Sequence, residues 1–185
     1  MQAAFARAGF GVVGVFADPD GRAFEPDVSS TIWMIAQREG APTVMHVVTR
    51  GPLDGPDRDE AVAFLRAEGY SHTISPADRV FAAWMNAEIV GAVRLAAEHG
   101  AIVLRGMRVR SDVTRRGIGR QLLDRLQKEL GPATCYCIPY AWLIGFYGRI
   151  GFQVIDGANA PPFLAERHAA YRQRGLNIVI MERRG

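Results

Sequence analysis

Two glycines lie among arginines at the start of a predicted helix. The segment VLRGMRVRSDVTRRGIGRQLL, residues 103–123, begins as an apolar strand and ends in a helical pattern. Between the two, Gly117 and Gly119 are accompanied by Arg115, Arg116 and Arg120. The first turn of a helix has backbone N–H groups without partners and a partial positive charge, and a glycine there has no Cβ to hold an anion away. We therefore expect these residues to bind a pyrophosphate.

A simpler interpretation of the same residues is a tight strand-to-helix turn surrounded by solvated arginines, since glycine is the usual turn residue. Two other nucleotide-binding motifs fit less well. A Rossmann turn needs a third glycine near Leu122 and an acidic residue about 20 positions later. A phosphate-binding loop needs Gly-Lys-Ser/Thr, which the sequence lacks.

Composition and charge fit one soluble domain with an anionic partner. The chain has 185 residues, 49% of them hydrophobic, a net charge of +3 and a pI of about 9.2. No Lys/Arg tract is interleaved with aromatic residues, so we do not expect nucleic-acid binding. Six arginines crowd one segment, which predicts a single local anion site. They are Arg105, Arg108, Arg110, Arg115, Arg116 and Arg120.

The cysteines and the apolar runs bear on location. Cys135 and Cys137 are two apart on a predicted strand, too distant for an unstrained disulfide. Together with four scattered histidines they give no zinc spacing, so we expect no metal, and a reducing, cytoplasmic location. No apolar run approaches the ~20 residues of a membrane span. The run at 9–16 is short and interrupted by glycine, and we expect no cleaved signal peptide.

The elements expected from residue 43 onward give a mixed α/β order that contains a meander, unlike the strict alternation of a doubly wound fold. Strands are expected at 43–50, 79–86, 88–97, 101–109, 133–138, 152–155 and 176–184. Helices are expected at 52–70, 118–130, 141–150 and 161–175. We expect Asp57 to cap the first helix and Gly69 to end it. In the helix expected at 118–130, apolar residues recur every fourth position: Ile118, Leu122, Leu126 and Leu130.

Residues 1–42 are harder to interpret. A hairpin is suggested by the apolar run at 9–16, the Asp-Pro-Asp-Gly turn at 18–21 and the segment 22–26, and another strand-like run covers 31–37. An extra sheet edge, a dimer contact and a partly disordered segment are the alternatives. We treat residues 1–42 as an N-terminal extension and residues 43–185 as the main domain.

Two motifs resemble those of the GCN5-related N-acetyltransferase (GNAT) family. Residues 114–119, TRRGIG, resemble its Gln/Arg-x-x-Gly-x-Gly/Ala motif, although Thr114 takes the first position, which removes a side chain but no backbone donor. Residues 145–152, GFYGRIGF, are similar to the family's Phe-Tyr-x-x-x-Gly-Phe segment. The resemblance implies a mostly antiparallel central sheet flanked by helices. It also implies a bulged strand before the glycines, which splays from its neighbour between the strands ending near Val109 and Ile138.

The resemblance further implies an acetyl-CoA-dependent N-acetyltransferase, in which an amine attacks the thioester directly. The backbone of Met107, Arg108 and Val109 would then hold the pantetheine arm and polarise the thioester carbonyl. Tyr147 would protonate the leaving thiolate, or would simply pack beside Phe146. The pyrophosphate would be bound at the helix start, by Arg115, Arg116, Gly117, Ile118, Gly119 and Arg120.

The resemblance does not identify a general base or an acceptor. The strands at 101–106 and 133–138 have no carboxylate, which leaves Glu98, His99, Asp112 or a water relay. The segment 156–175, with Arg167, Arg172 and Arg174, could face an acidic acceptor or solvent.

We expect a small-molecule primary amine as the acceptor and no membrane partner, with a homodimer left open. A protein amine, an antibiotic and a polyamine are alternative acceptors. Transfer of a longer acyl group, transfer to oxygen, and a non-catalytic acyl-CoA-binding regulatory module are the alternative functions.

Overall fold

The computed structural model describes residues 10–16, 33–38 and 47–185, and the chain divides into two units, residues 1–45 and 46–185. In the first unit, β1 (Phe10–Phe16) pairs antiparallel with β2 (Trp33–Arg38). The strand expected at 31–37 corresponds to β2. The turn expected at 18–21 and the strand expected at 22–26 lie outside the described residues.

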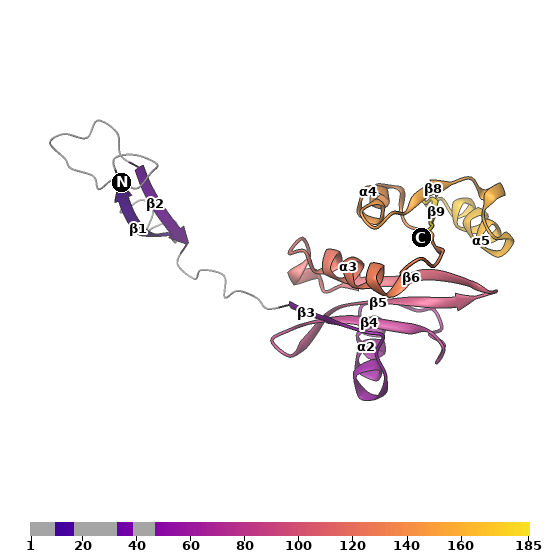
Figure 1. Ribbon diagram of the computed structural model, residues 1–185, viewed down its shortest axis with the longest axis horizontal. Helices are drawn as coiled ribbons and strands as arrows, with labels where there is room; N and C mark the ends of the chain where they lie inside the picture. The colour runs from indigo at the N-terminus through magenta and orange to yellow at the C-terminus, as the bar shows by residue number, and fades with distance from the viewer. Residues whose placement is uncertain (1–9, 17–32, 39–46) are drawn as a thin grey trace. The chain divides into compact units, whose positions relative to one another are not determined.

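The second unit contains a seven-stranded sheet in the order β3-β4-β5-β6-β7-β9-β8 (Figure 1). Neighbouring strands are antiparallel except β6 and β7, which are parallel. This confirms the expected mixed, mostly antiparallel sheet. The strands are β3 (Val47–Arg50), β4 (Arg79–Met85), β5 (Glu88–Glu98), β6 (Ala101–Val109), β7 (Cys135–Cys137), β8 (Gln153–Ile155) and β9 (Ile180–Arg183).

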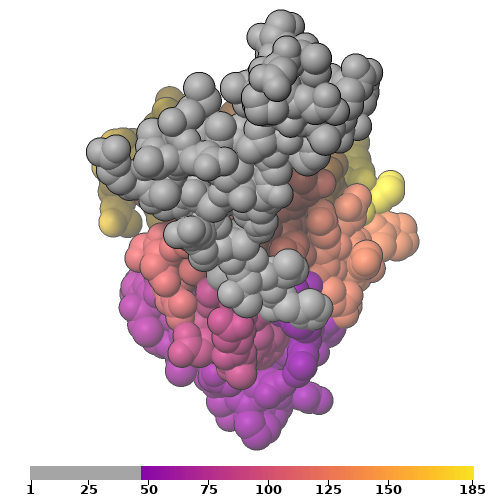
Figure 2. All heavy atoms as spheres, turned by 90° about the vertical axis from the view of Figure 1, so that its left-hand side faces the viewer, coloured from indigo at the N-terminus to yellow at the C-terminus, as the bar shows by residue number. Residues whose placement is uncertain are grey.

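Two helices cover opposite faces of this sheet (Figure 1). Ala92 of β5 packs in one cluster with Ala61 and Leu65 of α2. A Cβ at the preceding residue, Gly91, would lie 3.0 Å from Ile118 of α3, on the other face. In Figure 2 the violet atoms around α2 lie at the bottom of the unit and the orange atoms of later elements lie above them. The helices are α2 (Gly55–Ala67), α3 (Ile118–Leu130), α4 (Ile144–Gly148) and α5 (Pro162–Gln173).

The ends of α2 and the buried face of α3 test the helix predictions. Asp54, not Asp57, is the N-cap of α2, because the proline in the first turn favours a helix start just before it; the Asp57 prediction was wrong. Gly69 follows the helix end with φ +79° and donates to Arg66 O, as in a Schellman motif. In α3 the four expected positions are buried together with Leu123, which confirms the period.

A bulge in β6 controls which of its side chains share a face. Arg94 of β5 pairs with Arg105, and Ala92 pairs with Arg108, so one residue of β5 faces two of β6. Gly106, with φ +66°, absorbs this extra residue. Arg105 and Arg108, three positions apart, therefore lie on the same face of the sheet as α2.

β6 and β7 separate after a short paired stretch. Only Ile102 with Cys135 and Val103 with Tyr136 are paired. Beyond these pairs the two strands diverge, which confirms the expected splay between the strands that end near Val109 and Ile138.

A buried ion pair stabilises the α2 face beside the bulge. Arg94 and Asp78 are 2% and 5% exposed, and Arg94 donates to the Asp78 carboxylate. Arg94 also donates to the Tyr70 hydroxyl over 2.8 Å and 3.1 Å, and the Tyr70 ring contacts the Gly106 position. The pair thus holds the wall of α2 against the bulged strand.

We expect Arg94→Met to lower the free energy of unfolding by about 3–5 kcal/mol, because it leaves a buried carboxylate without its partner. Urea unfolding followed by circular dichroism measures this loss. The double variant Arg94→Met/Asp78→Leu should lose less than the sum of the two single variants. Additive losses would show that the two side chains do not interact.

Candidate active site

The divergence of β6 and β7 opens a cavity of about 450 Å³. Of the residues expected to act on the acetyl group, Met107, Arg108 and Tyr147 line it. The rest of the lining comes from the loop after α2, from β6, from the end of β7 and the segment that follows it, and from α5 and the segment that follows it. These residues are Gly69, Tyr70, Ser71, His72, Val103, Leu104, Arg105, Gly106, Cys137, Ile138, Pro139, Tyr140, Leu143, Arg167, Tyr171, Arg174, Leu176 and Ile178.

The edge of β6 that faces this cavity has no strand partner beyond Val103 among the described residues. The pantetheine arm of coenzyme A is peptide-like, so this edge can bind it as an added strand. One acceptor on the strand is already used, because Arg108 Nη1 donates to the Met107 carbonyl over 3.1 Å. The other backbone N–H and C=O groups of Met107, Arg108 and Val109 are therefore the ones left for the role expected of this strand, which is to bind the pantetheine arm.

The start of α3 suits an anion. Gly117 is the N-cap residue in a left-handed conformation (φ +83°), and no side chain caps the helix. The first helical bond runs from Gln121 N to Gly117 O, so the three preceding amides, of residues 118–120, lie in the first turn without a helical acceptor. No described atom lies within 4 Å of the position of a Cβ on Gly117. These features fit a pyrophosphate.

Phe146 connects the start of α3 with Tyr147. A Cβ on Gly119 would lie 3.2 Å from the Phe146 ring and 3.9 Å from Val109. Gly119 therefore allows α4 to pack close to α3, in addition to any role toward an anion. Phe146 contacts the ring of Tyr147 edge-on, with 5.0 Å between centroids. The start of α3 and the cavity are thus adjacent.

Tyr147 presents a buried, protonated phenol at the wall of the cavity. Its side chain is 7% exposed, and burial, together with the nearby Cys137 thiol, raises the pKa of the phenol. It therefore stays protonated at neutral pH. Its hydroxyl makes no hydrogen bond to another described residue, so it is available to a ligand.

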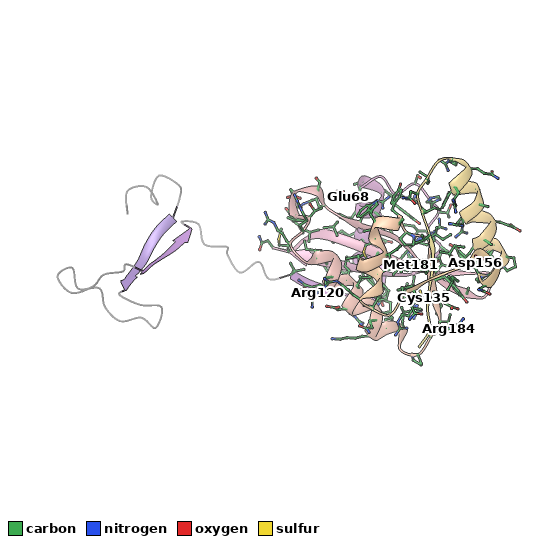
Figure 3. All side chains as sticks on the ribbon, turned by 90° about the horizontal axis from the view of Figure 1, so that it is seen from above. Glu68, Arg120, Cys135, Asp156, Met181 and Arg184 are labelled. Carbon is green, nitrogen blue, oxygen red and sulfur yellow. The ribbon has the colours of Figure 1, made fainter. Side chains whose placement is uncertain are left out.

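The cysteines are poor nucleophiles. Both are free and buried, as expected from their spacing, and Figure 3 shows Cys135 near Met181 in the interior. Burial raises the pKa of Cys135 to about 12 and raises the pKa of Cys137 well above its ordinary value. A thiolate is needed for attack, so neither residue supports a covalent acyl-enzyme.

The carboxylates considered from the sequence do not suit a general base. Glu98 accepts hydrogen bonds from Arg105 (2.8 Å) and Arg167 (2.6 Å). Burial by itself would raise the pKa of Glu98, but these two bonds outweigh it and lower the pKa. The hydrogen bond from Arg110 lowers the pKa of Asp112 in the same way. Neither carboxylate lines the cavity.

His72, to which sequence reasoning gave no role, lines the cavity. Arg66 donates to the carbonyls of Tyr70 and His72 over 2.9 Å and 2.8 Å, which fixes the loop. Partial burial and then the charges of Arg105, Arg94 and Arg167 lower the pKa of His72, so its imidazole is neutral at neutral pH. The sequence contains one indication that His72 could take part in a site: it lies in a loop directly after the end of a helix, and functional residues are common in such loops.

The six arginines of residues 105–120 do not form one anion site. Arg105 and Arg108 line the cavity, whereas Arg110 is paired with Asp112 and Glu88. Only the other three accompany the start of α3, namely Arg115, Arg116 and Arg120, all exposed. The prediction of a single site was wrong, because the bulge and the strand end direct neighbouring side chains to different places.

Neither a metal cluster nor a membrane-spanning helix is found among the residues that the structure describes. No group of three or more His, Cys, Asp or Glu side chains there could hold a metal ion. No helix in the same ranges has the length and apolar character needed to cross a bilayer.

Comparisons with solved structures show a shared fold. The N-acetylglutamate synthase of Neisseria gonorrhoeae, in complex with coenzyme A and N-acetyl-glutamate, is 18% identical with a TM-score of 0.54 over 75% of this chain, which spans only 35% of that protein. An acyl-CoA N-acyltransferase from Pseudomonas aeruginosa is 18% identical, with a TM-score of 0.53 over 75% of this chain and 99% of that protein. The ribosomal-protein-S18-alanine N-acetyltransferase of Escherichia coli is 18% identical, with a TM-score of 0.53 over 75% of this chain and 94% of that protein.

The sequence comparison matches part of the chain to a family model. No curated protein matches the chain. Residues 76–154 match the family model described as an acetyltransferase (GNAT) domain, and this range contains the glycines at the start of α3 and Tyr147. Residues 76–154 of this chain therefore resemble a GNAT acetyltransferase domain, and the splayed sheet that contains them agrees with this match.

Proposed function

We propose that the chain transfers an acetyl group from acetyl-CoA to a primary amine of a small molecule by direct attack on the thioester. The observation that carries this proposal is the cavity between β6 and β7, which reaches Tyr147 and lies beside the open start of α3. We also propose that residues 43–185 form the catalytic domain and residues 1–42 an extension.

The binding of acetyl-CoA would use main-chain groups on two elements. The amides of Ile118, Gly119 and Arg120 would bind the pyrophosphate, with Arg115 and Arg116 adding positive charge and Gly117 giving close access. The unpaired edge of β6, at Met107, Arg108 and Val109, would bind the pantetheine arm and orient the thioester carbonyl. A backbone N–H directed at the developing oxyanion lowers the barrier to attack.

Two side chains would move protons. The amine nitrogen attacks the carbonyl carbon, and the C–S bond breaks to release the thiolate. The Tyr147 hydroxyl protonates that thiolate, because the phenol is held in its neutral form. The proton lost by the amine passes to the neutral imidazole of His72, directly or through water.

We expect Gly117→Trp to weaken acetyl-CoA binding by more than about 100-fold, because the indole would occupy the pyrophosphate position and prevent several charge-assisted hydrogen bonds. Calorimetry on the full chain measures this change. Gly131→Trp is the matched control: Gly131 ends the same helix, also has positive φ and also has open space around it. Equal affinity in the two variants would exclude the start of α3 as the pyrophosphate site.

We expect Tyr147→Phe to lower kcat by about 100-fold with little change in acetyl-CoA affinity, since it removes a proton donor and keeps the ring. Thiol release followed at several pH values measures the effect. An unchanged kcat would leave Tyr147 as a packing residue. If acetyl-CoA binds but no amine releases thiol from the wild type, the acyl-CoA-binding module is the better function.

We expect kcat/KM of the wild type to fall with decreasing pH below about 6.5, where a histidine with a lowered pKa gains its proton and can no longer accept one. The groups around this imidazole are Tyr70, Arg94, Arg105, Arg167 and Glu98. His72→Gln should remove this acidic limb. An identical limb in the variant would assign it to another group or to the amine itself.

A further inference from the structure

The cavity has a strongly one-sided charge. Four arginines line it and no Asp or Glu does, as far as residues 47–185 are concerned. The whole chain is nearly balanced, with 22 Lys and Arg against 19 Asp and Glu, so this excess is local. The four are Arg105, Arg108, Arg167 and Arg174.

Two separate elements supply these arginines. The bulge at Gly106 places Arg105 and Arg108 on one face of β6. Across the cavity, α5 and its C-cap residue supply Arg167, Tyr171 and Arg174, spaced four and three positions apart on one helix face. The guanidinium groups thus approach the cavity from two sides.

One carboxylate reduces this charge but does not cancel it. Glu98 accepts one nitrogen of Arg105 and one of Arg167, which joins β5, β6 and α5. Four arginines less one glutamate leave a net charge of +3 at the lining. The guanidinium group of Arg174 makes no hydrogen bond or ion pair with any described residue, so its charge is available.

These arginines are not needed for the pyrophosphate. The start of α3 lies on the other face of the sheet, where Gly119 faces Val109 and Phe146. Arg105 and Arg108 share the α2 face with Ala92 and Arg94, their partners in the register. Figure 3 shows Arg120 of α3 and Asp156, which precedes α5, at opposite ends of the unit.

We infer that the acceptor is an amine that also carries an anionic oxygen group, a carboxylate or a phosphate, bound by Arg108, Arg167 and Arg174. This inference rests on the proposed acetyl transfer. Guanidinium groups form paired, charge-assisted hydrogen bonds with such groups. A polyamine, in contrast, would be repelled by the same charges.

The positive lining would also help the reaction. An ammonium group near several guanidinium groups loses its proton more easily, because the charged form is disfavoured. A cavity without a carboxylate base can then still present a neutral amine to the thioester.

The first experiment compares acceptors in a thiol-release assay with the full chain and acetyl-CoA. The pairs are β-alanine and β-alaninamide, and O-phosphoethanolamine and ethanolamine, with putrescine as a cation. We expect kcat/KM to be at least about tenfold higher for the anionic member of one or more pairs. A preference for the anionic member of the carboxylate pair or of the phosphate pair identifies which anionic group the cavity binds. Equal or faster transfer to neutral amines or putrescine would overturn the inference and would support acetyl transfer.

A matched pair of variants tests the location. Arg174→Gln should raise KM for the preferred anionic amine about tenfold and leave acetyl-CoA affinity unchanged. Arg172→Gln, on the same exposed helix end but outside the cavity, should change neither. Identical behaviour of the two variants would show that the anion is bound elsewhere and would overturn the assignment.

Binding without acetyl-CoA separates this inference from the proposed function. Saturation-transfer NMR with the same amines should show binding of anionic members that Arg174→Gln weakens. Such binding without any acetyl transfer would support an anion-binding cavity and contradict the proposed reaction. If no anionic amine binds or is acetylated, the inference fails, whatever acetyl-CoA does.

Discussion

Backbone groups at a separated strand edge need partners, and β6 has such an edge. Its pairing with β7 stops after Val103, in the middle of the sheet. Unpaired N–H and C=O groups are costly unless water or a ligand satisfies them. A peptide-like ligand arm can do so without any change in the protein. The cavity, the exposure of Met107 and Arg108 to it and the position of Tyr147 at its wall all follow from this interruption.

Beside the interruption, β6 is packed on both of its faces. On the α2 face, the buried pair of Arg94 and Asp78 holds Tyr70 against the bulge at Gly106. On the α3 face, Phe146 packs against the position of Gly119. Neither contact bridges β6 and β7, so the packing of β6 on its two faces leaves its edge toward the cavity open.

Positive charge is divided between two places with different physical origins. At the start of α3, the charge comes mainly from free amides and the helix dipole, which serve an anion at close range. In the cavity it comes from guanidinium groups on β6 and α5, which can recognise an anionic group at a greater distance. The buried cysteines and Asp112 take no part in either, whereas Glu98 pairs with Arg105 and Arg167 of the cavity and reduces its charge.

Local patterns in the sequence determined the elements of the domain and its glycine motif. The buried positions of α3 at every fourth residue, the end of α2 at Gly69 and the order of the strands along the chain depend on local patterns, and the structure confirms them. The N-cap of α2 was misplaced by three residues, because a proline in the first turn outweighed the spacing of the acidic residues.

Only the tertiary structure decided which distant side chains meet. It divided six neighbouring arginines among three environments and joined two of them with Arg167 and Arg174 from α5. It also brought His72 to the cavity and removed Glu98 from the candidates for a base. The reason is that one extra residue in a strand changes the face of every side chain after it, and no local pattern shows where that residue will be absorbed.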